Sequence, residues 1–343
     1  MSIDRITALG ADVLLAAQNQ HFSGVVVIHH RGHLVVEYSG GLANRAGPTP
    51  MTVTTRLATA SGTKGFTALA VASLIEEGVL GFDTPLFDVI GNDLPYVDRA
   101  VTIAHLLGHT SGVGDYLDEE QLGDIDDHVL DVPVHLLEGP QDYVPILNRY
   151  KQRGSPGSHF AYNNSGYVML ALAIERSTGS RYHDEVRRRV FEPASMEATD
   201  FLRSDRLPSG TALGYLADGR TNVFHLPVIG TGDGGAYTTA PDMMRFWDTL
   251  FAGRIVDHSL VARMTTATGQ ASQDRTYGLG FWIGHDRTTV QLEGMDAGVS
   301  LRSGSNPKTG LCHCIIANNS SDVWPLARII DNHLKSEDET RTR

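Results

Sequence analysis

The chain has only two cysteines, Cys312 and Cys314, among its 343 residues. They stand two positions apart in a strand-like run, so both side chains lie on one face of a sheet, a geometry that suits a disulfide poorly. A metal site would need more ligands than this pair and the intervening His313 supply. We therefore expect buried thiols in a protein of the reducing cytoplasm, with no metal.

Long apolar runs and an excess of positive charge are also missing. No segment approaches the roughly 18 apolar residues that would suggest a membrane span. The first six residues include Asp4 and lack the apolar run of a signal peptide. The formal net charge of −12 argues against nucleic acid as a partner, because phosphate binding depends on lysine and arginine. This composition is typical of a soluble globular protein that binds neither nucleic acid nor membranes.

The order of the predicted elements indicates an α+β fold built on an antiparallel sheet. Amphipathic helices are predicted near both termini, over residues 4–20 and 323–334. Strand-like segments occupy residues 24–28, 33–38, 277–284, 288–292, 298–302 and 311–318. Because the last four follow one another directly, we expect antiparallel pairing, with the terminal helices packed on the sheet.

Between these segments the chain is predicted to form short helices broken by glycine and proline turns. We predict a mostly helical subdomain over residues 83–215, inserted into a discontinuous sheet domain of residues 1–82 and 216–343. The last eight residues, 336–343, are dense in charge and are expected to be disordered.

A serine and a lysine are placed to share a proton at the start of an apolar helix. In Ser61-Gly62-Thr63-Lys64 the two side chains are three residues apart, so they lie on one helix face. Apolar residues at helical spacing follow and predict one buried side. Ser61 then falls in the first turn, where free N–H groups bind an oxyanion and the helix dipole lowers the pKa of Lys64. A neutral Lys64 could accept the Ser61 proton, although the motif alone is weak.

Tyr162 and Asn164 form a second polar group, after a turn rich in serine, proline and glycine. A phenol is a poor base in water, but beside an amine it can carry protons between a nucleophile and a leaving group. The Asn164 amide could orient Lys64 and a substrate carbonyl at once. Such residues are also common in turns, so this pair gains meaning only together with the serine and the lysine.

With these four residues together, the chain resembles the serine beta-lactamase-related family, which includes class C beta-lactamases, D,D-peptidases, esterases and amidases. The similarity extends over five segments in family order: residues 55–70, 74–80, 101–112, 156–167 and 234–243. The resemblance implies a beta-lactamase/transpeptidase-like fold with Ser61 as the nucleophile. It implies that Lys64 and Tyr162 share the proton transfers and that Asn164 positions them. It also implies oxyanion donors in the backbone N–H groups of Ser61 and Met295.

The third motif of the family is altered in this chain. Members usually carry lysine or histidine, one residue and then glycine on the strand opposite the nucleophile, whereas this chain has Leu292-Glu293-Gly294. The loss of the cation predicts that the protein is not a true beta-lactamase, and Glu293 would repel an anionic substrate. Leu292, Glu293, Gly294 and Asp296 are candidate substrate-binding residues. Glu293 and Asp296 could contact a substrate amine or transfer protons, or they could be solvated acids at a strand end.

Two other motifs are weaker. Residues 230–235 have the glycine spacing of a dinucleotide fingerprint, but no parallel crossover unit is evident around them. His105 and His109 have the i, i+4 spacing of zinc ligands. No glutamate follows His105, so we interpret both histidines as structural.

The sequence therefore predicts a cytoplasmic serine hydrolase that cleaves a small ester or amide through an acyl-enzyme on Ser61. Neither a cofactor nor a metal is expected. The small-molecule substrate is the expected partner, and a homo-oligomer is left open. The alternative is a non-catalytic ligand-binding or regulatory module on the same fold, which the altered third motif would favour.

Overall fold

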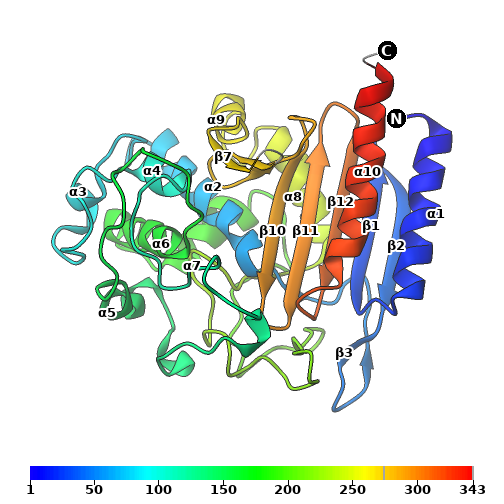
Figure 1. Cartoon of the computed structure of the whole chain (residues 1–343), viewed down its shortest axis with the longest axis horizontal. Coiled ribbons are helices and arrows are strands. Elements are labelled where there is room, and N and C mark those ends of the chain that lie inside the picture. The colour runs from blue at the N-terminus through cyan, green and yellow to red at the C-terminus, as the bar shows by residue number, and fades with distance from the viewer. Residues whose placement is uncertain (273–274, 342–343) are drawn as a thin grey trace.

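An antiparallel sheet runs through the molecule (Figure 1) in a computed structural model that describes residues 1–272 and 275–341. The strands lie in the order β2-β1-β12-β11-β10-β9-β8-β7, and neighbours pair antiparallel. Their bounds are β1 Gly24–His30, β2 His33–Gly40, β7 Gly269–Ser272, β8 Arg275–Tyr277, β9 Trp282–Ile283, β10 Val290–Asp296, β11 Val299–Asn306 and β12 Leu311–Ala317. The predicted α+β fold is confirmed.

The predicted strand over residues 277–284 is wrong, because two strands share this segment. β8 ends at Tyr277 and β9 begins at Trp282. Gly280 between them has a φ of 97°, and a Cβ there would collide with Ala68. This left-handed backbone and this close approach both require glycine, so the chain turns at Gly280 instead of continuing as one strand.

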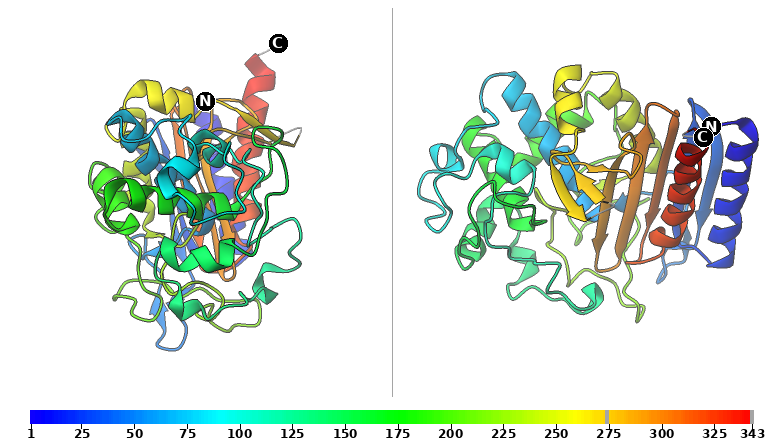
Figure 2. Two further views of the ribbon diagram at one scale, coloured as in Figure 1. Left: turned by 90° about the vertical axis from the view of Figure 1, so that its left-hand side faces the viewer. Right: turned by 45° about the horizontal axis from the view of Figure 1, so that its top comes forward.

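Two helices from the ends of the chain cover one face of the sheet. α1 (Ile3–Asn19) and α10 (Val323–Arg341) lie side by side (Figures 1 and 2), and their apolar sides form a core with β1, β2 and β12. α10 is described as far as Arg341, and the disorder expected over residues 336–343 stays a prediction. Residues 342 and 343 lie outside the described residues.

The other face of the sheet carries α8 (Ala240–Phe251), which packs on β1, β11 and β12. α2 (Thr63–Glu76) lies between the sheet and the helices beyond it. All its residues from Thr63 to Ala72 are buried. The expectation of a single buried side is therefore wrong, because α2 packs against other elements all around its axis.

The helices that fall within residues 83–215 gather at one end of the molecule (Figure 1). They are α3 Leu86–Ile90, α4 Ile103–Leu107, α5 Val144–Leu147, α6 Asn164–Thr178 and α7 Tyr182–Val186. α2, α3, α4 and α7 all contact α6, which is the centre of this part of the chain. The division into two domains at residues 83 and 215 stays a prediction.

Shorter elements connect these parts. The helical turns are η1 Ala60–Gly62, η2 Ile125–Asp127, η3 Val134–Leu136, η4 Pro140–Tyr143 and η5 Arg187–Phe191. The remaining elements are β3 Leu42–Asn44, β4 Thr49–Pro50, β5 Leu57–Ala58, β6 Tyr237–Thr238 and α9 His258–Met264.

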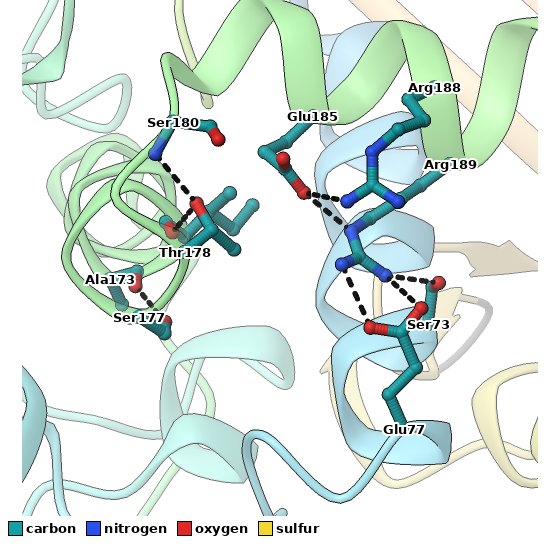
Figure 3. Close-up of polar contacts among 10 residues, drawn as sticks. Ser73, Glu77, Ala173, Ser177, Thr178, Ser180, Glu185, Arg188 and Arg189 are labelled. Carbon is teal, nitrogen blue, oxygen red and sulfur yellow. Dashed lines mark hydrogen bonds and ion pairs between the residues drawn. The ribbon is translucent and has the colours of Figure 1, made fainter.

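A buried arginine fastens α2 to the helices beyond it (Figure 3). Arg189 on η5 donates to Glu185 at 2.7 Å, to Ser73 at 2.8 Å and to Glu77 at 2.9 Å. Arg189 and Glu185 are 6% and 3% exposed. Because a buried charge is costly unless it is paired, this group fixes the far end of α2 relative to α7 and η5.

Both cysteines on β12, Cys312 and Cys314, are free and buried, as predicted. Within the described residues, no helix combines the length and the apolar character that crossing a membrane would take.

Candidate active site

Ser61 lies in a tight turn between a short strand and a buried helix. β5 leads into η1, and α2 begins only at Thr63, so Ser61 precedes the α-helix instead of lying in its first turn. The Thr63 hydroxyl donates to the Ala60 carbonyl at 2.9 Å and holds this turn. Ala60 has a φ of 45°, which is unfavourable for a residue with a Cβ. Such strain persists where the surroundings enforce it, and it is frequent at active sites.

Strand β10 approaches the Ser61 turn closely at Gly294. A Cβ on Gly294 would stand 2.8 Å from Ser61 N and 2.9 Å from Ala60 Cβ, so no larger residue fits. Ser61 is the second residue of η1, and its N–H therefore has no acceptor within the turn. Met295 follows Gly294 on the strand. The N–H groups of Ser61 and Met295 are thus compatible with the predicted oxyanion donors.

The Lys64 amine joins the nucleophile to two further oxygen acceptors. Its Nζ donates to Ser61 Oγ, Asn164 Oδ1 and the backbone oxygen of Asp233, each at 2.7 Å. Burial lowers the pKa of Lys64, although the nearby Asp233 and Glu119 carboxylates oppose this shift. A buried amine of lowered pKa in contact with a serine hydroxyl has the geometry of a general base beside its nucleophile.

Tyr162 borders the same amine. Its ring centroid lies 4.9 Å from Lys64 Nζ, and its hydroxyl group is hydrogen-bonded to Ser61. Burial, followed by the Glu119 carboxylate, raises the pKa of Tyr162 well above its usual range, and the hydrogen bond to Ser61 offsets only part of this. Tyr162 is thus a neutral phenol, which can give a proton but does not readily hold a negative charge.

Asn164, the first residue of α6, is held on both sides of its amide. Its Oδ1 accepts from Lys64, while its Nδ2 donates to Leu117 O at 2.7 Å and to Glu119 Oε1 at 3.3 Å. The amide therefore orients Lys64, but the protein already occupies the NH₂ group that was expected to bind a substrate carbonyl. Asp115 accepts the backbone N–H of Asn164 at 2.9 Å and fixes the start of α6.

The glycine-rich segment 230–235 packs under Lys64. The carbonyl of Asp233 accepts from Lys64, and a Cβ on Gly232 would collide with the Tyr167 carbonyl of α6. The glycine spacing thus serves close packing in this fold. The Tyr116 hydroxyl donates to Asp233 Oδ2 at 2.5 Å. Asp233 and Tyr116 were not predicted from the sequence. The one available signal for Asp233 was an acidic residue inside a glycine-rich turn.

The third-motif residues differ in their surroundings. Leu292 is 2% exposed and belongs to the larger core. Glu293 accepts from Arg302 Nη1 at 2.5 Å and also pairs with Arg275, while Arg302 donates to Asp331 of α10 at 2.8 Å. Two guanidinium groups compensate the charge of Glu293 and weaken any repulsion of an anionic substrate, so that repulsion stays a prediction.

Asp296, the last residue of β10, lies in the same cavity as Ser61. Asn164 and Asp233 also line this cavity. Burial, followed by the Glu119 carboxylate, raises the pKa of Asp296 to about 7, and Lys64 opposes the shift. Asp296 is half-buried at the wall of this cavity and, unlike Glu293, has no arginine partner among the described residues.

The two spaced histidines have structural contacts. His105 Nδ1 accepts the Thr102 N–H at 3.2 Å at the start of α4, and His109 Nδ1 accepts the Asn163 N–H at 3.1 Å. Burial lowers the pKa of His109 well below its usual range, so its ring is neutral. In the part of the chain whose side chains the structure describes, no group of three or more histidine, cysteine or acidic residues is placed to hold a metal ion.

The fold and the contacts around Ser61 point to one protein family. The chain belongs to the beta-lactamase family, whose model matches residues 6–330. A penicillin binding protein from Bacillus halodurans has a similar structure, with a TM-score of 0.88 and 36% identity, over 93% of this chain and 99% of that one.

Curated relatives agree with this assignment. Penicillin-binding protein 4* of Bacillus subtilis (strain 168) is 30% identical over 68% of this chain and 53% of its own length. A D-aminopeptidase of Brucella anthropi is 28% identical over 71% of this chain and 45% of its own length. The chain thus spans about half the length of these relatives.

Proposed function

We propose that the protein cleaves a small ester or amide through an acyl-enzyme on Ser61. The observation that carries this proposal is the 2.7 Å contact between Ser61 Oγ and the buried Lys64 Nζ. In the proposed reaction, Lys64 in its neutral form donates to Asn164 Oδ1 and the Asp233 carbonyl only. Its lone pair then takes the hydroxyl proton as Ser61 Oγ bonds to the substrate carbonyl carbon. The N–H groups of Ser61 and Met295 hold the resulting oxyanion.

The leaving group then receives a proton. Neutral Tyr162 donates it as the bond from the carbonyl carbon to oxygen or nitrogen breaks. Protonated Lys64, whose Nζ lies 4.9 Å from the Tyr162 ring centroid, then gives its proton to the resulting phenolate. Water attacks the acyl-enzyme in a second step, with the same groups removing its proton and returning one to Ser61. Replacing Lys64 with glutamine removes the base, so kcat should fall roughly 10²–10⁴-fold, whereas Lys308→Gln on the surface should leave it unchanged.

The cavity favours a substrate without negative charge. Among its described lining residues, Asp233 and Asp296 are acidic and there is no lysine or arginine. An anionic beta-lactam would enter this cavity without the usual cation opposite the nucleophile, so we propose that the protein is not a true beta-lactamase. The similarity to a D-aminopeptidase supports an amide or ester substrate instead.

Labelling with a fluorophosphonate tests the proposal directly. We expect a stoichiometric mass increase on Ser61, none in the Ser61→Ala protein, and normal labelling in a Ser158→Ala control at an exposed serine. We also expect turnover of p-nitrophenyl esters and none of a chromogenic cephalosporin. An unlabelled Ser61 and no turnover of any ester would refute the proposal and favour the non-catalytic binding module. A cytoplasmic location and a homo-oligomer remain predictions.

A further inference from the structure

The Asp296 carboxylate stands in the active-site cavity without a partner. No hydrogen bond contributes to its pKa, and the charges that act on it are those of Glu119, Lys64 and Asp233. Within the described residues, its oxygens have neither a hydrogen-bond donor nor an ion pair. Removing a carboxylate from water without a partner costs free energy. An unpaired carboxylate in the active-site cavity therefore indicates that a ligand is its missing partner.

Asp296 lies close to the nucleophile. Gly234 separates it from the turn that carries Ser61, because a Cβ on Gly234 would stand 3.5 Å from Ala60 O and 3.6 Å from Asp296 Oδ2. Asp296 also directly follows Met295, whose N–H is the proposed oxyanion donor. A substrate whose carbonyl oxygen is bound at Met295 would therefore present the atoms next to that carbonyl to Asp296.

The surrounding charge favours a cation at this point. Glu119 and Asp233 add negative potential at Asp296, and Lys64 is the basic group that acts on it. Lys64 already donates to three oxygens and has a lowered pKa. Glu293, on the same strand, has two arginine partners. The protein thus compensates the charge of Glu293 with its own arginines. The charge of Asp296 is left for a ligand in the cavity to compensate.

We propose that Asp296 binds the primary ammonium group of the substrate, and that the substrates are esters or amides of amino acids with a free amine beside the scissile carbonyl. This inference rests on the proposed acyl-enzyme function and specifies its substrate class. The ammonium donates to the Asp296 carboxylate and supplies the positive charge that the cavity lacks. An ion pair of this kind is favourable because Asp296 is half-buried and a charge-assisted hydrogen bond is stronger there than in bulk water.

A matched pair of substrates tests this proposal. Alanine p-nitroanilide, as both enantiomers, carries the amine, and propionyl p-nitroanilide is the same molecule without it. We expect kcat/KM to be roughly tenfold or more higher for one alanine enantiomer than for the propionyl compound, as for a hydrogen bond to a charged group. Asp296→Asn should abolish this preference by lowering kcat/KM for the preferred alanine enantiomer toward the value for the propionyl compound. Asp4→Asn, an exposed acid on α1, is the control.

The outcomes separate this inference from the function on which it rests. If Ser61 is labelled by fluorophosphonate but the two substrates react equally, the amine site is refuted and the hydrolase stands. If Asp296→Asn slows both substrates alike, Asp296 serves the reaction in general and the amine site is also refuted. If Ser61 takes no label and neither compound reacts, the proposed function itself fails.

Discussion

Trp282 stacks on Tyr162, with ring centroids 5.9 Å apart and ring planes inclined by 15°. The Arg275 guanidinium also lies over the Trp282 ring, 4.1 Å from its centroid, and pairs with Glu293. Through Arg275, Glu293 therefore helps to hold the ring that orients Tyr162. The acid of the altered third motif contributes to positioning and has its charge compensated within the protein.

Trp282→Leu should lower kcat more than it changes KM. Without the flat ring beside it, Tyr162 loses its fixed orientation toward the leaving group, and misplacement of a proton donor costs roughly 10- to 100-fold in rate. Trp282→Phe keeps an aromatic face and should retain most of the activity. Steady-state kinetics with a p-nitrophenyl ester measure both variants. A rise in KM alone, with kcat unchanged, would show that Trp282 contacts substrate instead.

Gly294→Ala should inactivate the protein. The added Cβ would stand 2.8 Å from Ser61 N and would push the Ser61 N–H away from the other oxyanion donor, the N–H of Met295. Loss of one such donor costs about 10²–10³-fold in kcat, and overpacking costs about 1–3 kcal/mol of stability. Gly47→Ala, where the new Cβ meets nothing within 4 Å, is the matched control. The rate of fluorophosphonate labelling gives the readout, and equal rates for both variants would contradict the close approach.

Asp296 should make the protein less stable as the pH rises. Its pKa is about 7 in the folded protein against a usual 3.8, so the folded state holds the proton more tightly than the unfolded chain. This contribution to stability is complete below about pH 4 and lost as the pH rises through 7. Asp296→Asn is neutral at every pH, so its advantage in free energy of unfolding should grow between pH 5 and pH 8.

At pH 8 that advantage should reach up to about 4 kcal/mol, the upper limit set by a shift of roughly three pH units. Urea denaturation without substrate at the two pH values measures it. A variant that is less stable than wild type at pH 8 would mean that the carboxylate has a stabilising partner in the protein. We expect the Asp296→Asn protein to be more stable than wild type and to lose the preference for an amine. This combination is typical of a residue that is kept for function at a cost in stability.

Glu185→Gln should destabilise the fold without touching the site. Arg189 would lose a buried anion at 2.7 Å and keep Glu77, whose side chain is half exposed. Breaking a buried ion pair from one side costs about 3–5 kcal/mol. Asp184→Asn, in a more exposed pair with Arg187, should cost about 1 kcal/mol or less. Urea denaturation measures both changes, and equal small losses would show that the Arg189 group contributes little.

Much of the site could be predicted because its residues are close in sequence or belong to recognisable segments. Ser61 and Lys64 are three residues apart, and helical spacing brings them together whatever surrounds them. Tyr162 and Asn164 required the family resemblance, because nothing local shows that residues about 100 positions away return to Lys64. Asp233 and Tyr116 escaped prediction for the same reason, since their roles arise from a carbonyl oxygen and a contact across loops.

The sequence by itself determined the α+β fold, the pairing of serine with lysine, and the free cysteines, because periodicity and spacing act over a few residues. The tertiary structure decided which acids of β10 are neutralised. Glu293 and Asp296 are indistinguishable as strand acids, but the sheet brings Arg302 to Glu293 and leaves Asp296 beside Ser61. Charge compensation depends on distances of a few ångströms between segments far apart in the chain, and only folding sets those distances.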